Sequence, residues 1–231
     1  MRLLNISLFI LLTGLVATNL EAQTEKKSYN LKKGQVFDII FLSNKPDVDV
    51  KLQDYFKRAF PLANAEGYHS LIGFGIKENN QGNYHPQSMI FGYWDDLKGR
   101  ERFLKTVDTK MTDFHQMRRE IWSTFALTYW ELEEDISFEV DPAKFNVVTA
   151  YWKKEGQSME SFKKKWQSKS RKAGGETLVA FSEGTSPFGY YYAPDYLVIT
   201  SWDSRKSFEA FYEQNLKMDH STIKHVNQFI F

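Results

Sequence analysis

Histidine is the side chain here best suited to proton transfer, and two of the five histidines follow similar residues. His115 ends the sequence Lys-Met-Thr-Asp-Phe-His, and His220 ends the sequence Lys-Met-Asp-His. An imidazole can accept a proton from a bound phenol or quinol, and it can also bind a haem iron. The alternative is that both histidines lie at the surface or cap a helix. We take His115 and His220 as candidate catalytic residues.

The histidine spacing does not predict a metal site. No two histidines stand four residues apart, the spacing that places two ligands on one helix face, and the chain has no cysteine. We therefore expect no metal and no cofactor, with haem as the one group that a candidate histidine could serve.

Aromatic residues precede a proline at two places that resemble each other. Tyr84 and His85 stand before the first proline, and Tyr190 and Tyr192 before the second. A tyrosine offers a broad ring with a hydrogen-bonding tip, which suits a ring-shaped ligand or a sugar. These four residues are candidate ligand contacts. The alternative is that they close the ends of the fold or form a subunit contact.

These two places belong to an internal repeat. Residues 84–103 and 192–211 align without a gap at a spacing of 108. Chance pairing over such a window gives roughly one or two identities, so we infer a duplication. The seven identical pairs are Tyr84/Tyr192, Pro86/Pro194, Trp94/Trp202, Asp95/Asp203, Lys98/Lys206, Glu101/Glu209 and Phe103/Phe211.

Each half of the chain shows the element order β-α-β-β-α-β, which is that of a ferredoxin-like unit. We place the first repeat at residues 35–134, a linker at 135–142 and the second repeat at 143–231. Residues 23–34 are polar and lysine-rich and are expected to be a flexible lead-in. One face of each sheet stays uncovered by helices, so the two sheets can pack on each other. The predicted fold is α+β, with two tandem ferredoxin-like repeats packed sheet to sheet.

The first strand of each repeat carries a polar residue among apolar ones. We expect Phe37, Ile39 and Phe41 to lie under the helices. Asp38 and Asn146 would then face the space between the sheets, where they could contact a ligand. The alternative is that both lie at a strand end in water.

Trp94 and Trp202 each end a strand that leads into a helix. Each could form the wall of a ligand pocket, and the alternative is that each packs the start of the helix on the sheet.

Residues 197–214, LVITSWDSRKSFEAFYEQ, resemble the third strand and second helix of antibiotic-biosynthesis-monooxygenase-like domains in the dimeric α/β-barrel superfamily. The resemblance covers both halves, residues 35–231, and implies an eight-stranded barrel fused in one chain. The superfamily includes cofactor-free monooxygenases, haem-degrading and haem-binding enzymes, lyases and small proteins without known activity. Some members carry a histidine near the places of His115 and His220. The fold does not select among these activities.

The N-terminus has the layout of a secretory signal peptide over residues 1–22. A short basic start precedes a mostly apolar run from Leu3 to Val16, which is shorter than a membrane span, and small residues lead to Ala22. We expect cleavage after Ala22, no membrane association after cleavage, and a secreted or periplasmic protein. The alternative is an uncleaved N-terminal anchor.

The 30 basic and 29 acidic residues leave a net charge of +1, which argues against nucleic acid as a partner. Our first hypothesis is an exported protein that binds a small aromatic or apolar molecule in or at the end of the barrel. The second is a cofactor-free or haem-dependent monooxygenase-like enzyme, and the third is a non-catalytic protein-interaction module. The chain would be a monomer with pseudo-twofold symmetry or a homodimer.

Overall fold

The computed structural model describes residues 25–187 and 190–231, so the expected signal peptide, residues 1–22, lies outside the described residues. The first half contains the expected β-α-β-β-α-β order with an additional short helix before its last strand. Its elements are β2 (Val36–Asn44), α2 (Asp49–Ala65), β3 (Tyr68–Ser70), β4 (Phe74–Gly75), β6 (Ser88–Trp94), α3 (Leu97–Lys110), α4 (Phe114–Ile121) and β7 (Trp122–Glu131).

The second half repeats this order without the additional helix. Its elements are β9 (Phe145–Lys153), α5 (Glu160–Lys172), β10 (Glu176–Ser182), β11 (Tyr196–Trp202), α6 (Arg205–Leu216) and β12 (Ile223–Ile230). The strand orders are β3-β6-β2-β7 and β10-β11-β9-β12, with antiparallel neighbours. In both sheets the first strand of the unit lies between the third and the fourth, so both halves are ferredoxin-like, as predicted.

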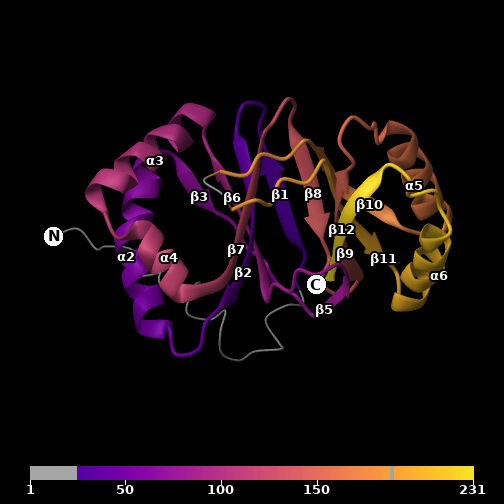
Figure 1. Cartoon of the computed structure of the whole chain (residues 1–231), viewed down its shortest axis with the longest axis horizontal. Helices are drawn as coiled ribbons and strands as arrows, with labels where there is room; N and C mark the ends of the chain where they lie inside the picture. The colour runs from indigo at the N-terminus through magenta and orange to yellow at the C-terminus, as the bar shows by residue number, and fades with distance from the viewer. Residues whose placement is uncertain (1–24, 188–189) are drawn as a thin grey trace.

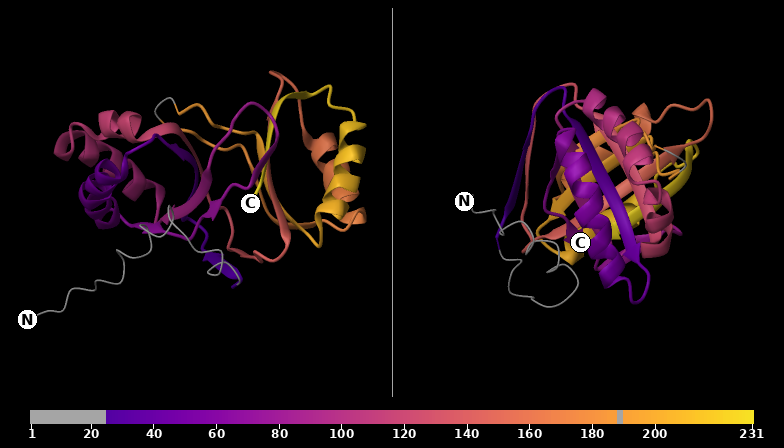
Figure 2. Two further views of the ribbon diagram at one scale, coloured as in Figure 1. Left: turned by 90° about the horizontal axis from the view of Figure 1, so that it is seen from below. Right: turned by 90° about the vertical axis from the view of Figure 1, so that its left-hand side faces the viewer.

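The two sheets face each other, and the helices lie on the outer sides, with α2, α3 and α4 on one flank and α5 and α6 on the other (Figures 1 and 2). The space between the sheets is filled by a continuous apolar core. Phe37 and Phe91 of the first sheet and Leu197 of the second are fully buried in it. No ligand space therefore separates the sheets at these residues.

The expected orientation of β2 is wrong. Phe37, Ile39 and Phe41 belong to the core between the sheets, and Asp38 points instead to the helix side. The two first strands are offset by one residue relative to the rest of the repeat, because Val36 pairs with Trp94 whereas Phe145 pairs with Trp202.

The offset assigns new partners to the two polar residues. Asp38 stands two residues after Val36, and Val147 stands two residues after Phe145. Asp38 therefore corresponds to Val147 and not to Asn146. A shift of one residue moves a side chain to the other face of its sheet. Asp38 and Asn146 are therefore not equivalent.

The lead-in and the linker form a two-stranded sheet that was not expected. β1 (Lys27–Leu31) pairs antiparallel with β8 (Ile136–Val140). Tyr29 stacks on Phe138 at a centroid distance of 4.8 Å, and Leu31 is buried in the core between the sheets. The alternating buried side chains of residues 27–31 explain why this segment is a strand and not a flexible lead-in.

Two connections cross from one half to the other. β5 (Glu78–Gln81), from the first half, extends the second sheet by pairing with β12. In return, the β10–β11 connection reaches the edge of β7, where Thr185 bridges Tyr129 and the Ser186 hydroxyl donates to the Leu127 carbonyl. This second crossing brings Pro187 and Tyr190 to the helix side of the first sheet. Within the described ranges, each helix is too short or too polar to span a bilayer.

Candidate functional site: a cavity between sheet and helices in the first repeat

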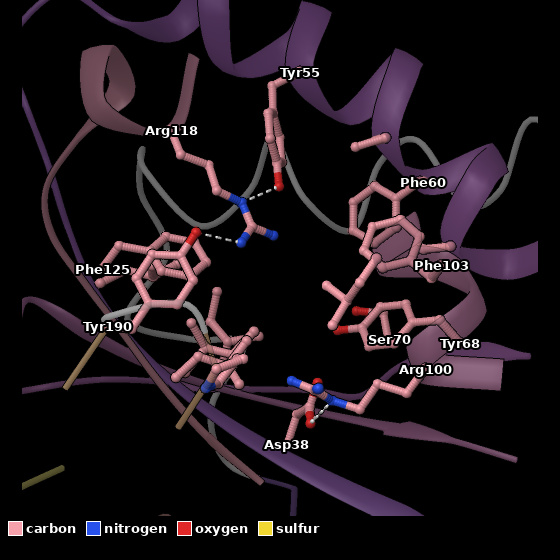
Figure 3. A pocket seen from close by; sticks show the side chains of 18 of the residues that line it. Asp38, Tyr55, Phe60, Tyr68, Ser70, Arg100, Phe103, Arg118, Phe125 and Tyr190 are labelled. Carbon is pink, nitrogen blue, oxygen red and sulfur yellow. Dashed lines mark hydrogen bonds and ion pairs between the residues drawn. The ribbon is translucent and has the colours of Figure 1, made fainter. Parts of the chain in front are cut away.

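A cavity of about 110 Å³, partly open to solvent, lies between the first sheet and its three helices (Figure 3). Its walls are mainly apolar. Strands β2, β6 and β7 form one side, helices α2, α3 and α4 the other, and the β10–β11 connection covers one edge. The lining residues used below are Asp38, Tyr55, Ala59, Phe60, Ala63, Tyr68, Trp94, Arg100, Phe103, Arg118, Trp122, Phe125 and Tyr190.

Small side chains on α2 explain why this space is open. Ala59 and Ala63 lie one turn apart on the buried face of the helix. The helices α2 and α5 are each followed by a glycine with positive φ, Gly67 and Gly174. Counted back from these glycines, Ala59 stands at the same position as Trp166, which is fully buried in the second half. The first repeat therefore has a methyl group where the second has an indole.

The sheet side of the cavity carries a buried ion pair. The Asp38 Oδ1 atom lies 3.4 Å from Arg100 Nε, and both side chains are at most 4% exposed. The Trp94 indole N–H donates to Asp38 Oδ2 at 2.9 Å. The Arg100 guanidinium also lies 3.7 Å from the centre of the Tyr129 ring. These contacts satisfy two buried charges that would otherwise be costly to remove from water.

The second repeat replaces this ion pair by apolar residues. Val147 stands at the position of Asp38. Because α3 and α6 align at a spacing of 108 residues, Phe208 stands at the position of Arg100. Trp202 has no carboxylate to bind, and its indole donates to Thr200 Oγ1 at 3.0 Å. One fold thus exists in two versions within one chain, and only the first carries charges at this position.

A second arginine lies on the other side of the cavity (Figure 3). Arg118 Nε donates to the Tyr55 hydroxyl at 2.8 Å, and Arg118 Nη1 donates to the Tyr190 hydroxyl at 2.8 Å. Its guanidinium lies 4.0 Å from the Phe114 ring centre and 4.4 Å from that of Phe125. Four segments of the chain therefore fix the position of this cation.

Burial dominates the protonation chemistry of the cavity wall. Burial raises the pKa of Asp38 above its usual value of 3.8, and Arg100 and the Trp94 N–H act against this rise. Burial likewise raises the pKa values of Tyr55 and Tyr68. Tyr55 and Tyr68 therefore remain neutral phenols at physiological pH.

No family model matches this sequence, and no curated protein matches it. Several solved structures do match it. An anthrone oxidase-like protein has a TM-score of 0.52 and 13% identity over 87% of this chain and 94% of its own. A candidate monooxygenase from Fusobacterium nucleatum has a TM-score of 0.43 and 12% identity over 87% and 92%. A chlorite dismutase variant from Candidatus Nitrospira defluvii has a TM-score of 0.48 and 7% identity over 87% and 92%.

The chain has the dimeric α/β-barrel fold. This confirms the fold that the resemblance of residues 197–214 implies. At 13% identity the likeness concerns the fold and leaves the activity open. In this chain both repeats of the barrel are fused, and the cavity belongs to the first.

The structure brings three of the predicted site residues together at the cavity, namely Asp38, Trp94 and Tyr190. The other non-histidine candidates lie elsewhere. The ring centroids of Tyr84 and Tyr192 lie 5.3 Å apart. Tyr192 belongs to the core between the sheets, and Tyr84 packs against that core. Trp202 is packed against Phe211 in the core of the second repeat. Asn146, at the start of β9, donates through Nδ2 to the Asp141 carbonyl.

The histidines do not line the cavity. His115 Nε2 lies 3.2 Å from Asp108 Oδ1 in an exposed contact between α4 and α3. His220 Nδ1 lies 2.9 Å from the Met218 carbonyl, and its ring packs on Phe162 of the second repeat. His85 is exposed and contributes only its carbonyl, which accepts from Ser43.

The cavity does not fit a haem. Its lining residues include no histidine, cysteine or methionine, and the tyrosines Tyr55 and Tyr190 already accept hydrogen bonds from Arg118. A volume of about 110 Å³ is of the order of one aromatic ring, whereas haem is a macrocycle of four pyrroles. His115 and His220 are not among the residues that line this space.

Arg118, Tyr55 and Arg100 were missed by the sequence analysis. One signal could have indicated Arg118. It stands four residues after Phe114 and three before Ile121, both buried, so it shares the apolar face of α4. A charged residue on an apolar helix face is unusual and points to a buried partner or a ligand.

Proposed function

We propose that the cavity of the first repeat binds a small aromatic molecule. The observation that carries the proposal is the pair Ala59 and Trp166, because the chain keeps a space in one repeat that an indole fills in the other. A core position left unfilled loses packing energy. A retained cavity with polar groups on both sides is typical of a ligand site.

The size and chemistry of the walls indicate the ligand. An engineered cavity of about 150 Å³ binds benzene, and this one has about 110 Å³ with an opening to solvent. One aromatic ring with a small substituent therefore suits it. Phe60, Phe103 and Trp122 offer ring edges and faces for contact. We place this binding protein outside the cytoplasm, on the basis of the signal-like N-terminus.

Ala59→Phe tests this proposal, since it fills the cavity and removes no polar group. The probe is 4-methylbenzamide, a neutral single-ring compound, and its binding is followed by calorimetry. We expect saturable binding to the wild type and a loss of at least tenfold in affinity for Ala59→Phe. The control is Ala173→Phe in the second repeat, where the side chain is half-buried away from the cavity. Equal binding to the wild type and to Ala59→Phe contradicts the proposal, and so does a wild type that binds no single-ring aromatic probe, neutral or charged.

Asp38 favours a second candidate function, a cofactor-free oxidase. A buried carboxylate with a raised pKa on the wall of an apolar cavity is suited to accept a proton from an acidic C–H or phenol. In such a reaction a single-ring hydroquinone, which suits a cavity of about 110 Å³, passes two hydrogens to dioxygen and gives a quinone and hydrogen peroxide. Oxygen uptake with hydroquinone, lost in Asp38→Asn, would support this function. Uptake no faster than without protein would exclude it for hydroquinone.

The third hypothesis, an interaction module, has less support. The large apolar side chains that are exposed in the described part of the chain, Val50, Ile72, Tyr191 and Leu216, belong to four separate segments. A docking surface needs a contiguous apolar patch.

A further inference from the structure

The positively charged Arg118 donates its hydrogen bonds to neutral acceptors. The groups that accept its hydrogen bonds are the phenol hydroxyls of Tyr55 and Tyr190. Burial raises the pKa of Tyr55, which makes this phenol harder to ionise. Within the described ranges, no carboxylate lies at ion-pair distance from Arg118. The other cation of the cavity, Arg100, has Asp38 as its partner.

The geometry around Arg118 leaves one edge of the guanidinium available. Nε and Nη1 are used by the two tyrosines, and Nη2 makes no hydrogen bond to any residue that the structure describes. The rings of Phe114 and Phe125 hold the plane of the group in place. A fixed guanidinium with a free N–H edge is matched to an oxyanion, most of all to a planar carboxylate.

We propose that the ligand of this cavity is an aromatic carboxylate whose carboxyl group pairs with Arg118. This inference rests on the proposed function and deepens it by naming the ligand class. A cation that is partly removed from water beside apolar walls is stabilised by an anion. The apolar walls then hold the ring, which excludes small inorganic anions as the best-fitting ligands.

Asp38 on the sheet side sets the orientation of the ligand (Figure 3). A carboxylate near Asp38 would meet a like charge, so the carboxyl group points to Arg118 and the other end of the ring points to Asp38. That end can be apolar, or it can carry a hydroxyl that donates to the Asp38 carboxylate. A dicarboxylate along this axis is disfavoured for the same reason.

The test compares 4-methylbenzoate with 4-methylbenzamide at pH 7, because the two probes have the same shape and differ in charge. We expect the carboxylate to bind the wild type about 10- to 100-fold more tightly, the range of a charge-assisted hydrogen bond. Arg118→Gln should lose most of this preference and leave the affinity for the amide within about threefold. Arg119→Gln, on the same helix and exposed, is the matched control and should keep the preference.

The outcomes separate the two proposals. Equal affinities of the two probes for the wild type overturn the carboxylate inference and leave the aromatic-binding cavity intact. Binding of neither probe overturns the proposed function itself. A preference that persists in Arg118→Gln assigns the anion to another group and overturns the role of Arg118. If Arg118→Gln does not fold, the two probes on the wild type and on Tyr190→Phe, which removes one acceptor and keeps the cation, still decide the question.

Discussion

The carboxylate of Asp38 lies 3.4 Å from the guanidinium of Arg100, in a repeat whose second copy has Val147 and Phe208 at the same places. A buried ion pair contributes little net stability compared with apolar residues of similar volume. The duplicated chain shows that the fold does not need these charges. Their presence beside the cavity is therefore better explained by a ligand than by folding.

The double variant Asp38→Val with Arg100→Phe copies the second repeat. We expect it to be neutral or more stable than the wild type by about 1–4 kcal/mol, whereas Asp38→Val alone should lose about 3–5 kcal/mol because Arg100 stays buried without a partner. Urea unfolding of the three proteins measures this. A double variant as unstable as Asp38→Val alone would contradict the equivalence of the two sites.

The two repeats also offer a matched pair of tryptophans. Trp94→Phe removes the N–H that donates to the Asp38 carboxylate, and Trp202→Phe removes one that donates to a neutral hydroxyl. Hydrogen bonds to charged groups contribute about 1.5–3 kcal/mol, and neutral ones about 0.5–1.5 kcal/mol. We expect the larger loss for Trp94→Phe in denaturant unfolding. Equal losses would mean that Asp38 does not depend on this donor.

Stability should depend on pH through Asp38. Because its pKa is raised in the folded state, the folded protein holds this proton more tightly than the unfolded chain. The stability linked to Asp38 is therefore complete below the unfolded value of about 3.8 and is lost as the pH rises through it toward the raised folded value. Asp38→Asn cannot titrate at this position. As the pH rises over this interval, the melting temperature of Asp38→Asn minus that of the wild type should therefore increase. A difference that is independent of pH would contradict the raised pKa.

The strand β1 should contribute to stability although it precedes the first repeat. Leu31 is buried, so Leu31→Ala should lose about 2–5 kcal/mol. Leu216→Ala, at a leucine that is half exposed, serves as the control and should change little. A loss below 1 kcal/mol for Leu31→Ala, roughly the level of a surface substitution, would mean that β1 is only loosely attached.

The duplication and the order of elements could be predicted because they depend on local patterns. The identities between residues 84–103 and 192–211 and the alternation of strand and helix signals are visible in the sequence, and they determine the ferredoxin-like topology. The face of β2 could not be predicted in this way. Both faces of the strand are buried, so only Asp38 distinguishes them, and its partners Arg100 and Trp94 come from other elements.

The site was only partly predictable for a similar reason. A tyrosine loop and two tryptophans were visible candidates, but the cavity depends on Ala59, whose meaning appears only when its counterpart Trp166 is known. Arg118 depends on a crossing of the chain that brings Tyr190 from the second repeat to the first. The sequence pattern contains no sign of this crossing, because the residues of the β10–β11 connection that the structure describes form neither a helix nor a strand.

The most direct test of the aromatic-binding cavity is an NMR titration of the six tryptophan indole N–H signals with 4-methylbenzamide. Trp94 and Trp122 line the cavity, whereas Trp166 and Trp202 lie in the filled core of the second repeat. Single Trp→Phe variants assign the signals. Saturable shifts of Trp94 and Trp122, with Trp166 and Trp202 unmoved, are the predicted result. No shift at Trp94 and Trp122, or shifts confined to the second repeat, would contradict a ligand site in the first.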